Sequence, residues 1–121
     1  MDLHVITRGD QRLIEGPPAT RLLHAPEDAV EIIGACFEQH TRAVLLYAEN
    51  LTERFFDLSS GEAGAILQKF RNYRIRLAVV ASPEGTPQSR RFRELTADER
   101  QGNDFRIFPD RMAAEAWLLS G

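Results

Sequence analysis

The chain has 121 residues, 43% hydrophobic and 27% charged, values typical of a globular protein and unlike those of a disordered chain. This length fits one domain with a single core. The formal net charge is −3, from 18 acidic and 15 basic residues, so we expect no general attraction to nucleic acid or to an anionic membrane.

Targeting signals and cysteine content indicate which cellular location and which kinds of site to expect. No window approaches the roughly 20 apolar residues of a membrane helix. The N-terminus lacks the basic flank and apolar region of a signal peptide, and we therefore expect a cytoplasmic protein. Cys36 is the only cysteine, which excludes an internal disulfide and a cysteine-based metal site. Its place on the apolar stripe of a predicted helix indicates a core residue.

The first third of the chain predicts a hairpin followed by a helix. Two short alternating runs, at 3–6 and 11–15, flank the turn signal Arg8-Gly9-Asp10, which is typical of a β-hairpin. Pro26 then opens a helix over 26–39, with acidic residues in its first turn. The apolar residues at helical spacing, which we expect to face the core, are Ala29, Val30, Ile33, Cys36 and Phe37.

Two continuous apolar runs, 43–47 and 75–81, predict central strands that are buried on both faces. Arg74 and Arg76 alternate into the second run, so one end of that strand meets solvent or pairs with nearby acids such as Asp57 and Glu49. Residues 105–108 alternate in polarity and predict an edge strand. Further helices are expected over about 60–72, over about 88–99 and after Pro109-Asp110.

The predicted order of elements is ββαβαβαβα. Alternating helices and buried strands indicate a mostly parallel sheet with right-handed crossovers. We therefore expect a single α/β domain over residues 1–121.

The start of the helix near residue 60 is the first candidate site. Ser59 and Glu62 match a capping box, in which a serine accepts from a helix amide and a glutamate reaches back. The small first turn also leaves its amides open to a partner or an anion. Glycine inside a helix costs up to about 1 kcal/mol against alanine, so Gly64 indicates a packing or contact role. The candidate interaction or anion site comprises Asp57, Ser59, Ser60, Gly61 and Gly64.

An acidic loop is the second candidate site. Glu49, Glu53 and Asp57 are spaced by four residues, so a helical turn capped by Asn50 would place them on one face. Three carboxylates can hold a hard cation, although an exposed acidic face explains the same pattern. The three histidines show no spacing suited to a metal, and we expect neither a resident metal nor a cofactor.

The segment from the first buried strand through Asp57 and Ser59-Ser60-Gly61 to Leu67 resembles the STAS domains, the anti-sigma-factor antagonists of bacteria. This resemblance implies a STAS-like fold. It also implies that a serine at the helix start, Ser59 or Ser60, is phosphorylated by a partner kinase that thereby switches partner binding.

Residues 49–80, ENLTERFFDLSSGEAGAILQKFRNYRIRLAVV, more closely resemble DUF4180, a family of small bacterial proteins of unknown function. The resemblance brings no established activity with it.

These observations favour a non-enzymatic bacterial regulatory or protein-interaction module whose surface is centred on Ser59–Gly64. Its protein partner is not identified by the sequence. The alternative is a small-ligand or metal-binding protein, or an enzyme, that uses Glu49, Glu53 and Asp57. Exposed sheet edges and apolar helix faces are also compatible with a homodimer.

Overall fold

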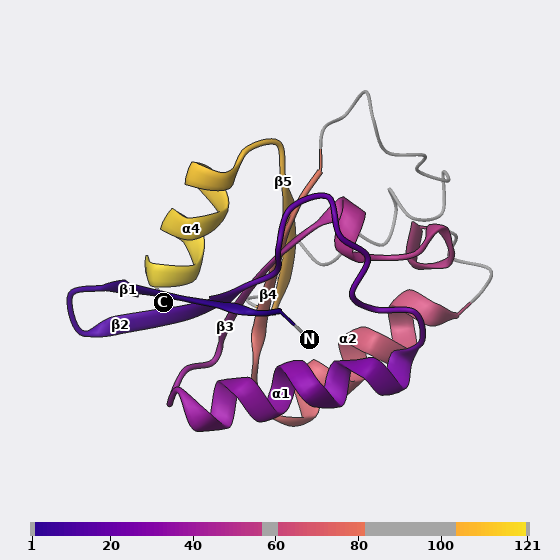
Figure 1. Cartoon of the computed structure of the whole chain (residues 1–121), viewed down its shortest axis with the longest axis horizontal. Helices are drawn as coiled ribbons and strands as arrows, with labels where there is room; N and C mark the ends of the chain where they lie inside the picture. The colour runs from indigo at the N-terminus through magenta and orange to yellow at the C-terminus, as the bar shows by residue number, and fades with distance from the viewer. Residues whose placement is uncertain (1, 57–60, 82–103, 121) are drawn as a thin grey trace.

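The order of the strands in the sheet follows their order in the chain. The computed structural model describes residues 2–56, 61–81 and 104–120, and in these parts five strands form one sheet of order β1-β2-β3-β4-β5 (Figure 1). Strand β1 is antiparallel to β2, and the other neighbouring pairs are parallel. The strands are β1 (His4–Arg8), β2 (Gln11–Glu15), β3 (Ala43–Tyr47), β4 (Arg76–Val80) and β5 (Phe105–Phe108).

The burial of the strands confirms the sequence patterns. Strands β3 and β4 pair from Ala43↔Arg76 to Tyr47↔Val80, and their central residues are buried on both faces, as continuous apolar runs require. Strand β5 lies at an edge of the sheet, as its alternation predicted. The hairpin is also confirmed, and its turn contains Gly9 with a φ of 62°, a backbone conformation that favours glycine.

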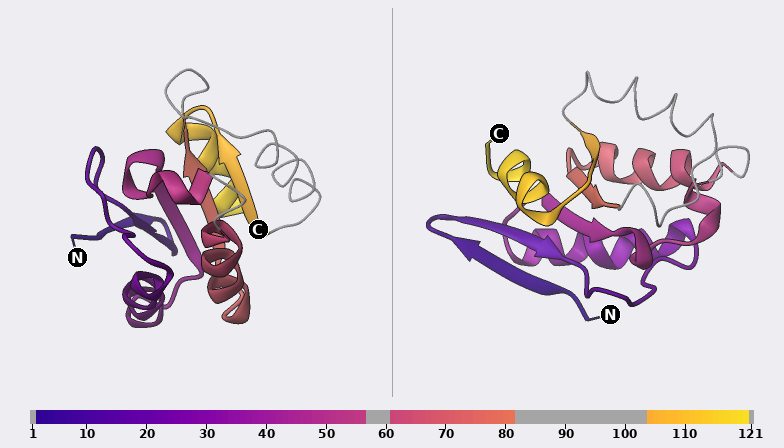
Figure 2. Two further views of the ribbon diagram at one scale, coloured as in Figure 1. Left: turned by 90° about the vertical axis from the view of Figure 1, so that its right-hand side faces the viewer. Right: turned by 90° about the horizontal axis from the view of Figure 1, so that it is seen from above.

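Helices cover both faces of the sheet. Helices α1 (Ala29–Glu38) and α2 (Glu62–Asn72) contact each other on one face, and α4 (Arg111–Ser120) packs against β3, β4 and β5 on the other (Figure 2). The Asp110 carboxylate accepts a hydrogen bond of 2.8 Å from the Ala113 amide and caps α4.

The predicted helix over 88–99 lies outside the described residues. No helix in the described ranges has both the length and the hydropathy to cross a membrane.

Each face of the sheet has its own hydrophobic cluster. The face under α1 and α2 buries large side chains, including Phe55, Phe70 and Phe105. The face under α4 buries Leu13, Leu45 and Leu118 among others. Together with the sheet topology, this arrangement confirms the α/β class, with a mixed sheet and three described helices.

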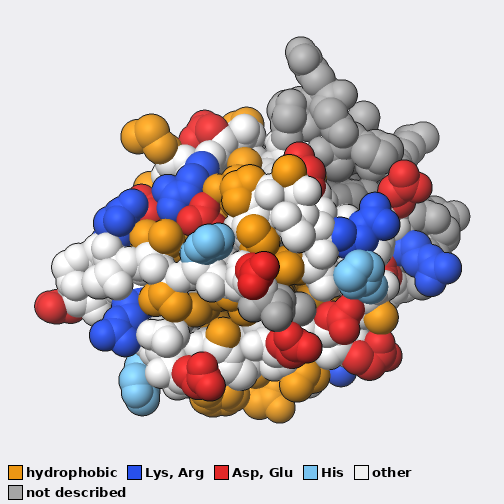
Figure 3. Space-filling model, in the orientation of Figure 1, with side chains coloured by type: hydrophobic (Ala, Val, Ile, Leu, Met, Phe, Trp, Pro, Cys, Tyr) orange, Lys and Arg blue, Asp and Glu red, His pale blue; other side chains and the backbone are white. Residues whose placement is uncertain are grey.

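The predicted inner stripe of α1 is wrong at two positions. Val30 and Phe37 are 59% and 63% exposed, whereas Ala29 and Cys36 are buried. Each exposed residue follows an inward residue directly and is therefore turned about 100° away from it around the helix axis. Apolar side chains consequently reach the surface over α1, on a face where acidic and basic side chains are otherwise interspersed (Figure 3).

Candidate functional site

The structure tests only part of the predicted site at the start of α2, because Asp57, Ser59 and Ser60 lie outside the described residues. The predicted capping box is wrong. Gly61 occupies the cap position with a φ of 76° and makes no side-chain cap bond. The Glu62 carboxylate is buried and accepts a hydrogen bond from the Thr52 hydroxyl, so it reaches into the preceding loop.

Gly61 and Gly64 are both exposed at this helix start. A Cβ added at Gly64 would meet no atom within 4 Å among the described residues. Close packing within the described chain therefore does not explain this glycine.

The acidic loop does not form the single helical turn that its spacing predicted. Glu49 lies in a 3₁₀ turn over Ala48–Asn50 and Glu53 in a second one over Glu53–Phe56, separated by an extended Leu51. Leu51 leaves the helical path to bridge Leu23. Both glutamates are exposed, and the described ranges contain no group of three side chains suited to a metal ion. Asp57, the third predicted ligand, lies outside those ranges.

Polar side chains instead meet at the carboxyl ends of β2 and β3. The Glu15 carboxylate accepts two hydrogen bonds from the Arg111 guanidinium, at 2.7 and 3.2 Å, and one of 2.5 Å from the Tyr47 hydroxyl. Glu15 is only 8% exposed. We call Glu15, Tyr47, Asn50 and Arg111 the carboxyl-edge network.

The ionisation of this network follows from its hydrogen bonds. Burial raises the pKa of Glu15, but the hydrogen bonds from Arg111 and Tyr47 outweigh it and hold the pKa below the ordinary 4.5. Burial and the bond to Glu15 raise the pKa of Tyr47 to about 12. At neutral pH the network is therefore a carboxylate held by a guanidinium and a neutral phenol.

Asn50 completes the network beneath the loop that follows β2. Its side-chain oxygen accepts from the Tyr47 amide at 2.7 Å, and its nitrogen donates to the carbonyls of Pro17 and Thr20 at 2.7 and 2.6 Å. Asn50 is fully buried, and Gly16 packs so closely on it that an added Cβ would lie 2.4 Å from its oxygen. The carboxyl-edge network is thus internally satisfied and holds loops in place.

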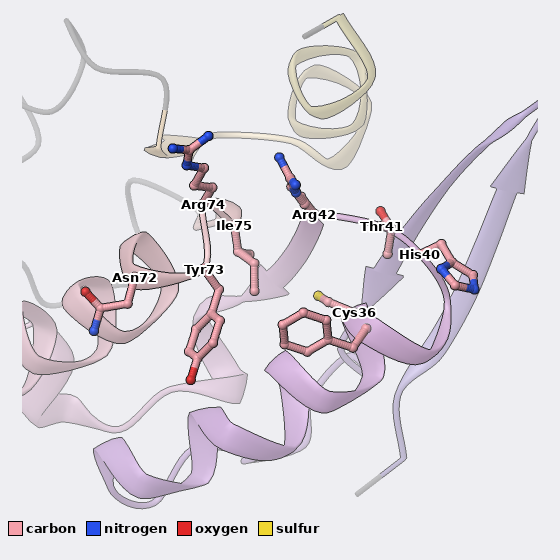
Figure 4. A pocket seen from close by; sticks show the side chains of 9 residues that line it. Cys36, His40, Thr41, Arg42, Asn72, Tyr73, Arg74 and Ile75 are labelled. Carbon is pink, nitrogen blue, oxygen red and sulfur yellow. The ribbon is translucent and has the colours of Figure 1, made fainter.

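The opposite edge of the sheet carries an open hollow where α1 and α2 end and β3 and β4 begin. This aromatic hollow has a volume of about 430 Å³ (Figure 4). It is lined by Cys36, Phe37, His40, Thr41, Arg42, Asn72, Tyr73, Arg74 and Ile75. Cys36 and Ile75 are buried, whereas most of the other lining residues are exposed. Burial raises the pKa of the Cys36 thiol to about 12, as expected for a core cysteine.

Two similar turns build this hollow. Each turn links the end of a helix to the next strand through a residue in the left-handed region, His40 with a φ of 55° and Arg74 with a φ of 57°. Glycine is the usual residue at such helix ends, and a side chain there costs about 1 kcal/mol or more. Strained positions of this kind cluster at functional sites.

Aromatic rings and arginines dominate the hollow. The rings of Phe37 and Tyr73 meet edge to face, with centroids 5.6 Å apart. Arg42 and Arg74 line the same hollow, and both side chains extend toward α4, away from the Tyr73 ring (Figure 4). Within the described parts of the chain, neither guanidinium has an ion pair or a side-chain hydrogen bond.

Arg74 and Arg76 do not pair with Glu49, one of the two acids expected as alternatives to solvent at this strand end, and Asp57, the other acid, lies outside the described residues. Glu49 follows β3, whereas both arginines lie where β4 begins, and β3 and β4 are parallel. Arg76 donates instead to the Leu118 carbonyl at 3.2 Å and stacks on the Trp117 ring at 4.1 Å. Arg74 is exposed, in agreement with the expectation that this end of the strand meets solvent.

A second hollow of about 470 Å³ lies beside the first and shares four of its residues, His40, Thr41, Arg42 and Arg74. This arginine hollow adds Arg12 and Arg76, and it reaches Leu118 and Leu119 at the end of α4. Among the described residues, Asp10 is the only acidic one that lines either hollow. We call the two hollows together the amino-edge groove.

No single stretch of the sequence indicates this groove, because the residues that line it are scattered from Asp10 to Leu119. The sequence pattern that could have pointed to the groove is the run Tyr73-Arg74-Ile75-Arg76, in which an aromatic residue and two arginines stand at the start of a buried strand. This run predicted a strand end that meets solvent or pairs with nearby acids, and it did not indicate a groove.

A protein-family model matches residues 8–118 of the chain, and its description is "Domain of unknown function (DUF4180)". No curated protein matches the chain significantly. No solved structure does so either.

Proposed function

The chain belongs to the DUF4180 family, and from this premise we propose that it is a non-enzymatic protein-interaction or regulatory module whose contact surface is the amino-edge groove. The observation that supports this proposal best is that Arg42 and Arg74, which no described residue engages, line the same hollow as the exposed Phe37–Tyr73 ring pair.

The groove has the composition of a binding surface. Scattered exposed apolar residues are normal on a protein, but aromatic residues and arginine together are enriched where partners bind most strongly. Phe37 is 63% and Tyr73 is 49% exposed, so both rings have apolar area left to bury on a partner. Full burial of such a side chain contributes about 1.5 to 3 kcal/mol.

Selection from a random peptide display library tests this function. We expect wild-type protein to enrich specific sequences that an Arg42→Ser/Arg74→Ser variant does not retain. Arg21→Ser is the matched control, because Arg21 is an exposed arginine outside the groove. Equal enrichment by wild type and the double variant, or no enrichment at all, would contradict the proposal.

We also propose the start of α2 as a second contact surface. We further propose that the domain has a STAS-like arrangement and that Ser59 or Ser60 is phosphorylated. The hairpin followed by alternating strands and helices supports the STAS-like arrangement, and the exposed Gly61 and Gly64 support access to the helix start. Intact-mass measurement of protein isolated from its host, which we also propose to be a bacterial cytoplasm, should show the mass gain of one phosphate. Its absence under several growth conditions would contradict phosphorylation.

A further inference from the structure

We propose that the amino-edge groove binds an extended acidic segment of a partner protein, with an aromatic or large aliphatic residue beside its carboxylates. This inference rests on the proposed function and adds the chemistry of the partner. It follows from the shape of the groove, from its apolar end and from its charge.

The aromatic hollow supplies a place for the apolar anchor. Phe37 comes from the end of α1 and Tyr73 from the end of α2, and their rings meet at an interplanar angle of 89°. The buried side chains of Cys36 and Ile75 also line this hollow. An apolar side chain placed here would cover both rings and remove their exposed area from water.

The arginines supply the charge complementarity. The planar guanidinium group binds a carboxylate through two parallel hydrogen bonds, and those of Arg42 and Arg74 are not engaged within the described chain. Arg12 extends the basic lining, and within the described residues its guanidinium donates one long hydrogen bond of 3.4 Å, to the Gln39 side chain. Carboxylates along a bound segment would therefore meet successive arginines.

Opposing charges do not cancel this attraction. Helices α1 and α2 both end at the groove, and each carboxyl end carries about half a negative charge. These ends offset about one positive charge, and Asp10 offsets another. Four arginines line the groove, so it remains positive.

The openness of the groove favours a chain segment over a small molecule. Small-molecule sites bury about 70 to 90% of their ligand, whereas most residues that line the aromatic hollow are themselves exposed. The two hollows share His40, Thr41, Arg42 and Arg74. Together they therefore form one extended path around the edge of the sheet. An extended peptide can follow such a path.

A nucleic acid fits this surface less well than a peptide does. A nucleic acid carries phosphates along its whole length, including the parts outside the groove. The affinity of a protein for it depends on how many phosphates the protein neutralises. The chain has a net charge of −3, and acidic side chains are interspersed with basic ones over the face in Figure 3. Charge beyond the groove would therefore oppose a long polyanion.

Fluorescence anisotropy with labelled, end-capped peptides tests the inference on the full chain. The probe is one tryptophan followed by four glutamates, prepared also in the reverse order. Matched peptides replace the glutamates by glutamine or the tryptophan by serine. We expect each replacement to lower the affinity for the peptide by at least about fivefold. Added salt should also lower the affinity for the acidic probe.

Protein variants locate the binding site. Arg42→Ser/Arg74→Ser and Phe37→Ser should each reduce affinity for the acidic probe by about tenfold or more, while Arg21→Ser should leave it unchanged. Denaturation midpoints close to that of the wild type would show that these variants are folded. Peptide binding that does not need the tryptophan, or tighter binding of a single-stranded oligonucleotide, would overturn the inference.

The same experiments separate this inference from the proposed function. If library selection enriches sequences through Arg42 and Arg74 but they are not acidic and aromatic, the inference fails and the interaction module stands. If neither the probes nor the library bind in a manner that depends on these arginines, both fail.

Discussion

The two ends of the parallel strands β2 to β5 differ in how their polar groups are used. At the carboxyl ends, Glu15, Tyr47 and Arg111 bond to one another and Asn50 bonds to three backbone groups. At the amino ends, Arg42 and Arg74 are not engaged within the described chain. Ligands of open α/β sheets usually bind beyond the carboxyl ends, yet at the carboxyl ends of β2 and β3 these polar groups bond to the protein itself.

This difference assigns separate consequences to the two edges. Substitution in a satisfied, buried network leaves partners unpaired and lowers the stability of the fold. Substitution of exposed, unengaged side chains leaves the fold intact and removes only what they could bind. The predictions below test this separation.

The largest effect is expected from Asn50→Ala. It leaves the Tyr47 amide and the carbonyls of Pro17 and Thr20 without their partner, which should lower the free energy of unfolding by about 3 kcal/mol. Asn72→Ala, an exposed asparagine at the amino edge, is the matched control with a small expected change. Urea denaturation measures both, and equal losses would remove the distinction between the edges.

Two glycines should respond in opposite directions to alanine. At Gly16 the added Cβ would lie 2.4 Å from the Asn50 oxygen and 3.0 Å from Leu46, so Gly16→Ala should destabilise the protein by about 2 kcal/mol. At Gly64 the same atom meets no described neighbour, and Gly64→Ala should stabilise α2 by up to about 1 kcal/mol. Thermal denaturation of both variants provides the comparison. A destabilised Gly64→Ala would point to a contact that the described residues lack.

The contribution of Glu15 should depend on pH. Because its pKa is lowered in the folded state, the native protein binds fewer protons than the unfolded chain around and below pH 4.5, and stability falls as the pH falls through that range. Glu15→Gln should therefore cost about 1 to 2 kcal/mol at pH 7 and progressively less in acid.

Denaturation midpoints between pH 3 and pH 7 measure this dependence. Glu49→Gln, an exposed carboxylate near the same edge, is the control and should show little difference at any pH. A constant effect of Glu15→Gln across the range would contradict the assigned ionisation.

The smallest effect on stability is expected at the amino edge. Arg42→Ser and Arg74→Ser should stay within about 0.5 kcal/mol of the wild type, as surface substitutions usually do. Phe37→Ser loses its ring contact with Tyr73 but only partly buried area, so its loss should not exceed about 1 kcal/mol. Urea denaturation checks all three. A much larger loss would assign the aromatic pair to the core.

Local patterns predicted the framework of the fold well. The Arg8-Gly9-Asp10 turn, the apolar run at 43–47 and the alternation at 105–108 each led to the element that the structure contains. These signals are local, because a turn residue or a period of apolar residues is set within a few positions.

Features that depend on distant partners were not predicted. Glu62 had the spacing of a cap, yet Thr52 binds its carboxylate. Phe37 had the spacing of a core residue, yet the direction in which α1 packs leaves it exposed. Glu15 and Arg111 are 96 positions apart. Such contacts are fixed by the order of the strands and the packing of the helices, which single-sequence periodicity does not contain.

The agreement between strand order and chain order has a consequence for synthesis. Each strand from β2 to β5 is laid beside the one made before it, so the sheet can grow in the direction in which a ribosome delivers the chain. Helix α4 breaks this rule, since it crosses back over β3 and β4 and places Arg111 on Glu15. Until α4 is made, Leu13 and Leu45 lack the side chains of this helix that bury them in the described structure, so the growing domain exposes an apolar sheet face to water.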